Sequence, residues 1–463
     1  TISGSFIGEG SGLTGITSTP DLKYRIYVTG SGANSIVHIT GSNKSSGAFS
    51  SVLGGPLNTA SAACATAVGG NNNCAGGALS TVVGGTTNIG GGSYTFVGGG
   101  ECNSATYLHS TVVGGCKNTA CYAGSQFIGG GKLNTGSSAF GVIAGGCSNF
   151  SAQTADYVTI GGGSCNTVAA NSCGAVIAGG RNNTVSGLQG TVGGGIQNIA
   201  SGSYSTVAGG ISGSANYDYT VIGGGINNTA DTSGSAVLSG NTNYASGSYT
   251  LIGGGENNIS LKDHSVIVGG TSNSGSGTCS FIGGGNLNKA TACYTNVIGG
   301  QTNEANGTYT SVIGGCCNLI SSAVCRASVL GGSRNIVSGS YSSILGGEDN
   351  CVTGECASIV GGSTNVLTHD KSFIIGSNIT STQACTTFVN NLSAGAAITA
   401  SYFKGDGSAL TNLNSSVFDD TTAPFTGSFT GSFVGAFTGD GSGLTGLAGN
   451  VQTGTTGITG SLT

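Results

Sequence analysis

The sequence is poor in charged residues. Of its 463 residues only 6% are Asp, Glu, Lys or Arg, Trp and Met are absent, and Pro occurs 3 times. Average soluble domains carry about a quarter charged residues, so an ordinary globular enzyme is not expected. The scarcity of Pro excludes collagen. The net charge of −5 and the lack of a basic cluster disfavour nucleic-acid binding. No run of about 20 apolar residues is present to form a membrane-spanning helix, so no membrane insertion is expected.

Glycine and small polar residues make up much of the sequence instead of charged residues. There are 92 Gly, and hydrophobic residues make up 37% of the chain, which argues against a disordered tract. The 16 Cys favour an oxidising, extracellular setting.

One sequence unit recurs along most of the chain. It reads aliphatic-x-Gly-Gly-x-x-Asn, followed by Ala-x-Gly-x-Tyr-Ser/Thr. Aligned on its Asn, which we call the anchor, 22 units run from residue 43 to residue 365, with Gly213 in place of Asn once. Seventeen intervals are 15 residues long, one is 16 and three are 17. Such a regular period indicates one structural coil per unit.

Fifteen residues accommodate two short strands and two tight turns, with Gly and Asn supplying positive φ. The sequence therefore predicts an all-β fold, a parallel β-solenoid of about 22 coils. At about 4.8 Å per coil, the stack is on the order of 105 Å long. Each coil pairs with the coils before and after it.

The residues before the anchor alternate in character. The residue six before it is nearly always aliphatic, as in Val82 and Ile252, and the residue eight before it is mostly small, as in Ser80 and Thr250. Because strand side chains alternate between faces, we expect these two positions to line the narrow interior of the coil.

The opposite strand face is not simply polar. Five residues before the anchor, Gly and bulky aliphatic residues alternate over much of the chain, and a bulky residue seven before the anchor accompanies the Gly. Phe96 thus accompanies Gly98, whereas Thr81 accompanies Val83. The combined side-chain volume of these two positions is thus roughly conserved, which matters only where another surface packs against them. We expect self-association with closed symmetry. The alternative is a wider solenoid with a second internal layer.

The anchors are interpreted as structural. Asn tolerates the left-handed region at turns, and stacked Asn amides can hydrogen-bond from coil to coil. The ladder predicted on this basis includes Asn58, Asn73, Asn88, Asn103, Asn118, Asn258, Asn288 and Asn303.

No constellation points to catalysis or to a cofactor. The four His lie in different coils, the Gly-rich strings follow from the repeat, and the 17 acidic residues are scattered along the chain. Calcium-binding repeats need an Asp in every turn, and most coils lack one. An ice-binding face needs a uniform Thr-x-Thr array, whereas Phe, Val and Tyr interrupt this one. We therefore predict that the protein is not an enzyme and binds no metal or cofactor.

The cysteines allow several arrangements. The pairs Cys165–Cys173 and Cys317–Cys325 share one spacing and fall at 17-residue coils, which suggests protruding loops closed by local disulfides. Cys116–Cys121 and Cys351–Cys356 are shorter candidate pairs. Stacking of Cys102 on Cys116 or of Cys279 on Cys293, or free buried thiols, are the alternatives.

Short modules flank the repeats. The segments 6–16, 403–413 and 437–447 share the pattern Phe-x-Gly-Asp/Glu-Gly-Ser-Gly/Ala-Leu-Thr, which suggests a small β-turn joint. We divide the chain into a joint module (1–17), capping strands (18–40), the solenoid (41–380), a linker (381–400) and fibrous β modules with two joints (401–463).

Units such as TFVGGGECNSA (95–105) and TLIGGGENNIS (250–260) resemble the head repeats of trimeric autotransporter adhesins. They are still more similar to the same repeats in bacteriophage and virus tail fibres, and the joint modules look like those of phage fibres. The repeat is longer than in the adhesin heads, and no neck, coiled-coil stalk or membrane anchor is visible. The resemblance implies a homotrimer of left-handed parallel β-rolls built for attachment.

We therefore expect a virion tail-fibre segment, located on the virion or extracellularly, that attaches to a glycan or protein of a host surface. Its other partners are further copies of itself and other fibre or tail proteins. A bacterial surface adhesin or a purely structural filament is the alternative. Aromatic residues nine before the anchor face a ligand, pack between chains, or merely cover the backbone. They include Tyr94, Tyr204, Tyr249 and Tyr309.

Overall fold

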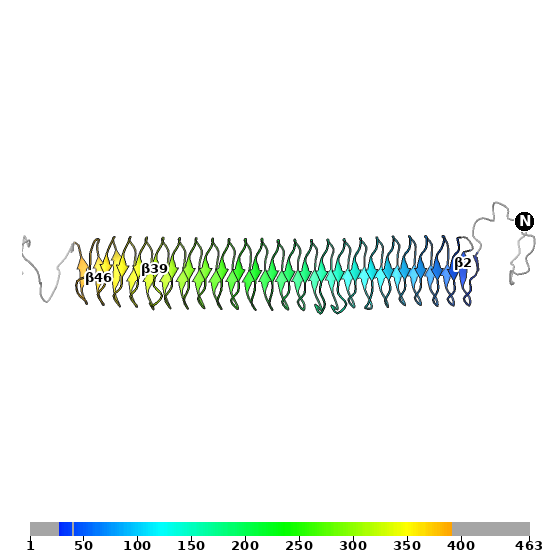
Figure 1. Ribbon diagram of the computed structural model, residues 1–463, viewed down its shortest axis with the longest axis horizontal. Coiled ribbons are helices and arrows are strands. Elements are labelled where there is room, and N and C mark those ends of the chain that lie inside the picture. Colours follow the sequence, from blue (N-terminus) through cyan, green and yellow to red (C-terminus); the bar gives the residue numbers. More distant parts are fainter. Residues whose placement is uncertain (1–26, 39–40, 391–463) are drawn as a thin grey trace, which may run out of the picture. The chain divides into compact units, whose positions relative to one another are not determined.

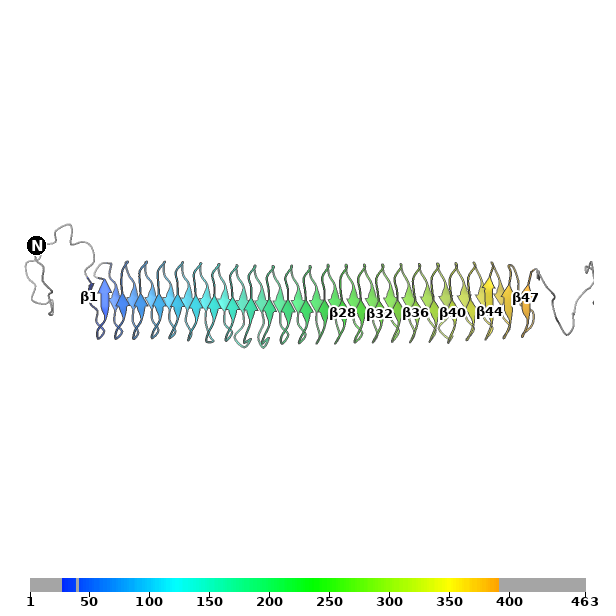
Figure 2. The same cartoon turned by 180° about the vertical axis from the view of Figure 1, so that it is seen from behind.

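The computed structural model describes residues 27–38 and 41–390, which form a straight stack of coils (Figures 1 and 2). This part of the chain contains strands and turns and no helix. It is a parallel β-solenoid with about 15 residues per turn, as the sequence predicts. The joint modules and the segments 391–400 and 401–463 lie outside the described residues.

Each coil contributes one strand to each of two sheets. Apart from the first strand, the strands of one sheet, here sheet A, lie six and seven residues before the anchor. Figure 2 shows several of them in one row. Sheet A comprises β1 (Tyr27–Thr29), β2 (Ile36–His38), β4 (Ser51–Val52), β6 (Thr66–Ala67), β8 (Thr81–Val82), β10 (Phe96–Val97), β12 (Thr111–Val112), β14 (Phe127–Ile128), β16 (Val142–Ile143), β18 (Thr159–Ile160), β20 (Val176–Ile177), β22 (Thr191–Val192), β24 (Thr206–Val207), β26 (Val221–Ile222), β28 (Ala236–Val237), β30 (Leu251–Ile252), β32 (Val266–Ile267), β34 (Phe281–Ile282), β36 (Asn296–Val297), β38 (Ser311–Val312), β40 (Ser328–Val329), β42 (Ser343–Ile344), β44 (Ser358–Gly361), β46 (Phe373–Ile375) and β47 (Thr387–Val389).

The strands of the second sheet, sheet B, directly follow the anchor. They are β3 (Lys44–Ser45), β5 (Thr59–Ala60), β7 (Cys74–Ala75), β9 (Ile89–Gly90), β11 (Ser104–Ala105), β13 (Thr119–Ala120), β15 (Thr135–Gly136), β17 (Phe150–Ser151), β19 (Thr167–Val168), β21 (Thr184–Val185), β23 (Ile199–Ala200), β25 (Ser214–Ala215), β27 (Thr229–Ala230), β29 (Tyr244–Ala245), β31 (Ile259–Ser260), β33 (Ser274–Gly275), β35 (Lys289–Ala290), β37 (Glu304–Ala305), β39 (Leu319–Ile320), β41 (Ile336–Val337), β43 (Cys351–Val352) and β45 (Val366–Leu367).

Pairing between coils is parallel and keeps one register, apart from a shift between β44 and β46 at Ile359–Gly361. Val82 lies opposite Val97, and Ile160 lies opposite Ile177 although the second pair spans a 17-residue coil. The additional residues are therefore taken up in the turns, which protrude from one edge of the stack in the cyan-to-green part of Figure 1. At the N-terminal end β1 pairs antiparallel with β2, within the range 18–40 that we assigned to capping strands.

Each of the two sheets contributes a single layer of side chains to the interior. The aliphatic residue six before the anchor, such as Val82 or Ile252, is fully buried, and the residue eight before it, a Ser or Thr in most coils, is buried as well. The hydroxyl of Thr250 donates to the carbonyl of Gly247 at 2.8 Å, which satisfies it locally. The anchor and a small residue two after it, usually Ala, complete the core. These positions confirm the interior predicted from the sequence.

The anchors form the predicted ladder, but not at a left-handed position. Asn288 is fully buried, and its Oδ1 accepts from the backbone N–H of Asn303 in the next coil at 3.0 Å. Its Nδ2 donates to the carbonyls of Gly284 and Gly300 at 2.8 and 2.9 Å. The residue before the anchor has the positive φ instead, as in Leu287 at 56°. The expectation that the anchor itself occupies the turn is therefore wrong.

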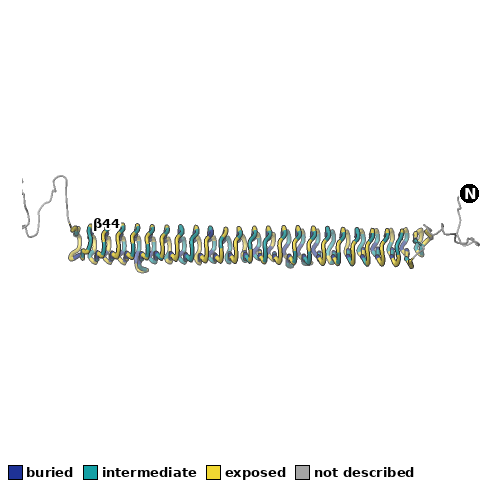
Figure 3. The backbone as a smooth tube through the Cα atoms, turned by 90° about the horizontal axis from the view of Figure 1, so that it is seen from above, coloured by how far each residue is buried: buried dark blue, intermediate teal, exposed yellow. Residues whose placement is uncertain are grey.

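No second internal layer exists in the described coils. The residues five and seven before the anchor point outward, where Val83 and Phe96 remain 39% and 37% exposed. This excludes the wider solenoid. Exposed residues recur in every coil along the stack (Figure 3).

The alternation of Gly and bulky residues five before the anchor has a backbone cause. A Cβ on Gly253 would lie 2.4 Å from the carbonyl oxygen of Val268 in the next coil. The bulky side chain two residues earlier covers the Gly. For example, a ring carbon of Phe96 lies 3.3 Å from the position that a Cβ on Gly98 would occupy.

Replacing the anchor Asn288 by Ala should lower the free energy of unfolding by at least about 2 kcal/mol, because the N–H of Asn303 and the carbonyl of Gly284 lose their partners. Asn286→Ala, at an exposed position two residues earlier, should change it by less than about 0.5 kcal/mol. Denaturant titration followed by circular dichroism measures both. Equal losses would show that the ladder has no special role.

Gly253→Ala should destabilise the fold by about 1–3 kcal/mol, because its Cβ would overlap a backbone carbonyl that cannot withdraw without breaking the ladder between coils. Gly269→Ala is the matched control, since a Cβ there meets nothing within 4 Å. Thermal unfolding of the two variants separates the cases, and a stable Gly253→Ala variant would refute the backbone explanation.

Candidate functional site

The outward face of sheet A is an apolar stripe without charge. Its two columns, five and seven before the anchor, contain no Asp, Glu, Lys or Arg from residue 51 to residue 375. Large apolar side chains on it are 37–53% exposed. They are Leu53, Val68, Val83, Phe96, Val113, Phe127, Val221, Leu238, Val268, Ile298, Ile313, Leu330, Leu345, Val360, Phe373 and Ile375. We call this surface the apolar stripe.

The outward face of sheet B is mixed: exposed apolar side chains such as Ile199 and Ile259 alternate along it with polar and charged ones. Lys289 and Glu304 lie in adjacent coils with Nζ and Oε1 2.6 Å apart, and this contact lowers the pKa of Glu304. The Tyr244 hydroxyl donates to Asp231 at 2.9 Å, which raises the pKa of Tyr244. Ion pairs of this kind remain hydrated and add little stability. Within residues 51–375, the outward face of sheet B therefore carries charged side chains, whereas the outward face of sheet A carries none.

The turn edge next to the anchors carries a cluster of ion pairs. The Arg334 guanidinium contacts Asp349 and Glu348 in the next coil, at 2.7 and 2.6 Å. The hydrogen bond from Arg334 lowers the pKa of Asp349.

The other turn edge carries the aromatic residues nine before the anchor, which we call the aromatic edge. Tyr204 stacks on Tyr219 with ring centres 5.2 Å apart, and Tyr294 on Tyr309 at 4.8 Å. Arg326 covers Tyr309 from the other side, at 5.6 Å.

Two histidines belong to the same edge. The His109 ring is tilted against Tyr94, and His264 stacks on Tyr249. All four predicted tyrosines are thus exposed, and each contacts the ring of a neighbouring coil. These contacts cover part of each ring, and the ligand-facing role stays a prediction.

The cysteines are free thiols throughout. The structure leaves all four predicted pairs unbonded, because a strand separates the members of most of them. Cys165 lies in the turn before β19 and Cys173 in the turn after it, and β39 separates Cys317 from Cys325 in the same way. Cys116 and Cys121 flank β13, and Cys356 lies in the turn after Cys351 of β43.

The stacked pairs, Cys102 with Cys116 and Cys279 with Cys293, are also unbonded. The closest sulfur contact joins neighbours in sequence, with the Sγ atoms of Cys316 and Cys317 2.9 Å apart.

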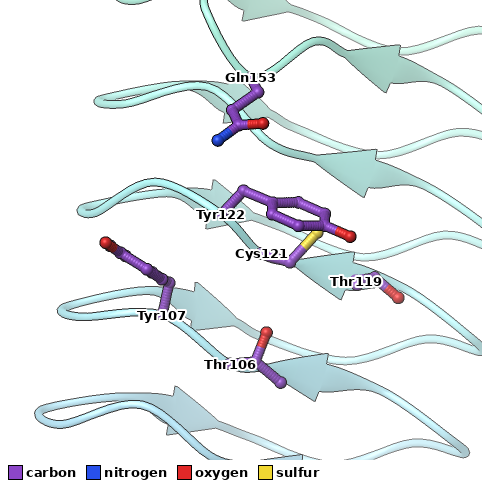
Figure 4. A pocket seen from close by; sticks show the side chains of 6 residues that line it. All are labelled: Thr106, Tyr107, Thr119, Cys121, Tyr122 and Gln153. Carbon is purple, nitrogen blue, oxygen red and sulfur yellow. The ribbon is translucent and has the colours of Figure 1, made fainter.

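Sequence reasoning missed a hollow on the outward side of sheet B (Figure 4). It has a volume of about 570 Å³ and is lined by Thr106, Tyr107, Thr119, Cys121, Tyr122 and Gln153. We call it the tyrosine hollow. The signal in the sequence was the change of coil length to 16 and then 17 residues next to two Tyr in a column that is mostly Gly or Ala.

The described residues hold no group of three or more His, Cys, Asp or Glu placed to bind a metal ion. That part of the chain also has no helix able to cross a membrane.

Alkylation of the native protein should modify all sixteen cysteines without prior reduction. Cys64, Cys165 and Cys293 are exposed and should react first, whereas burial raises the pKa of Cys74 and Cys351 and should slow them several-fold at pH 8. Peptide mass spectrometry over a time course gives the rates. A Cys165–Cys173 cross-linked peptide would instead support the local disulfide.

The sequence matches no known protein family, and comparison with curated proteins finds no similar chain.

Proposed function

We propose that this chain is a segment of a non-enzymatic, homotrimeric attachment fibre, displayed outside the cell on a virion tail. The apolar stripe carries the proposal. It is two side chains wide and, at about 4.8 Å per coil, on the order of 100 Å long. Small residues such as Ser, Thr, Gly and Ala interrupt its large side chains, above all between Phe127 and Val221, but no charged residue does. Large exposed apolar patches are uncommon on monomeric proteins, so an uncharged stripe of this length favours a permanent interface.

Only copies of the same chain match the stripe along its whole length. A symmetry axis parallel to the rod brings equivalent coils of each copy to the same level, so their spacing agrees by construction. Sheet A then faces the axis, and sheet B with its ion pairs faces water. The resemblance to tail-fibre and adhesin repeats favours three copies and a left-handed coil.

Attachment follows from the geometry of such a fibre. In the described coils the core is filled by small and aliphatic buried side chains, which supports a non-enzymatic role. The outward surfaces repeat three times around the axis, which multiplies weak contacts with a host surface. A structural filament without a receptor is the competing function, and it requires the rods to join end to end.

The native particle should have a mass of about 134 kDa, three times the 44.5 kDa of one chain. Val268→Lys with Ile313→Lys places two charges on the apolar stripe and should yield monomers. Ile259→Lys with Ile336→Lys places the same charges on sheet B and should leave the trimer intact.

Light scattering coupled to size exclusion measures these masses. A folded wild-type monomer contradicts the fibre, and so does dissociation by the sheet B variant alone. Electron microscopy of the same sample shows whether the rods stay discrete or join into filaments.

A further inference from the structure

We propose that the tyrosine hollow binds a neutral saccharide unit of a surface glycan. This inference rests on the proposed function, because a trimer closed through sheet A leaves sheet B and the hollow facing outward. Its residues come from neighbouring coils, and none of them belongs to the apolar stripe.

The hollow is produced by local departures from the repeat. Tyr122 lies in the 16-residue coil and has a φ of 70°, and its ring extends back over Cys121 (Figure 4). In the following coil the equivalent residues are Ser137 and Ser138, which are small and buried, so no side chain fills the space above Tyr122. Gln153, in the next coil, belongs to a lengthened turn and forms the far wall.

The lining has the chemistry that recognises sugars. The Tyr122 ring is 64% exposed and makes no ring contact within the described residues, unlike the rings of the aromatic edge. An aromatic face packs against the C–H face of a pyranose ring, and hydroxyl and amide groups bond its hydroxyls.

The polar groups needed for this are present and free. The hydroxyls of Tyr107, Tyr122 and Thr119 and the amide of Gln153 have no hydrogen-bond partner in the described part of the chain. Thr106 makes only a long bond of 3.4 Å to the carbonyl of Ala120.

Charge and size narrow the ligand class. The lining contains no Asp, Glu, Lys, Arg or His, so nothing in it recognises a sulfated, sialylated or amino sugar by charge. The hollow has a volume of about 570 Å³ but is largely open to solvent, so it suits a sugar ring resting on its floor rather than an enclosed ligand.

The test is binding of the intact oligomer to an array of neutral oligosaccharides built from glucose, galactose, mannose and N-acetylglucosamine. Saturation-transfer NMR of the best probe then gives its affinity. Tyr122→Asn removes the ring and suits the positive φ, and it should weaken binding at least fivefold. Gln153→Ala should weaken it by a smaller factor.

Tyr217→Ala is the matched control, because this tyrosine occupies the equivalent column and is 55% exposed but does not line the tyrosine hollow. It should bind like the wild type, and every variant must keep the native mass and circular dichroism. No binding by the wild-type oligomer, or equal affinity of Tyr122→Asn, overturns the proposal. Preference for charged over neutral glycans overturns it too.

The two proposals fail separately. An intact trimer that binds no neutral saccharide refutes the hollow as a sugar site and leaves the fibre standing. A monomer that binds a saccharide through Tyr122 refutes the trimer and keeps the site.

Discussion

The structure depends on one buried amide in each coil. The anchor Asn ties its own turn to the backbone of the following coil through both its oxygen and its nitrogen, at 2.8–3.0 Å around Asn288. Because strands of two residues make few ladder bonds, this side chain supplies the register that longer strands would give. Where Gly213 replaces the anchor, its own N–H still bonds the Oδ1 of Asn198, but it offers no amide to Asn228. Neighbouring coils hold the stack there.

A core this narrow leaves the outside free to specialise. The interior is filled mostly by small and aliphatic side chains and by one Asn in all but one coil, so these columns vary less along the chain than the outward ones. The outward columns have no such constraint, and they divide into an apolar stripe on sheet A, a mixed face on sheet B and two different turn edges. The chain therefore presents four parallel surfaces of different chemistry, each able to meet a different environment.

The turns absorb changes in length without disturbing the register. β18 and β20 pair as their neighbours do although 17 residues separate equivalent positions. Insertions thus alter the surface locally, and the tyrosine hollow lies beside such a change. Repeat proteins of this kind can gain a binding site without any change in the core.

The sequence by itself determined the fold class, the coil length, the interior columns and the existence of an Asn ladder, because a strict period with alternating aliphatic residues leaves few other ways to bury apolar surface. Only the tertiary structure decided that the anchor is buried while its predecessor takes the positive φ, since both sit at one turn and spacing does not separate them. It also left unbonded the cysteines that spacing had paired, three of the four pairs being divided by a strand. The hollow could be located only in the tertiary structure as well, since Tyr122 and Gln153 line it from coils that are two apart.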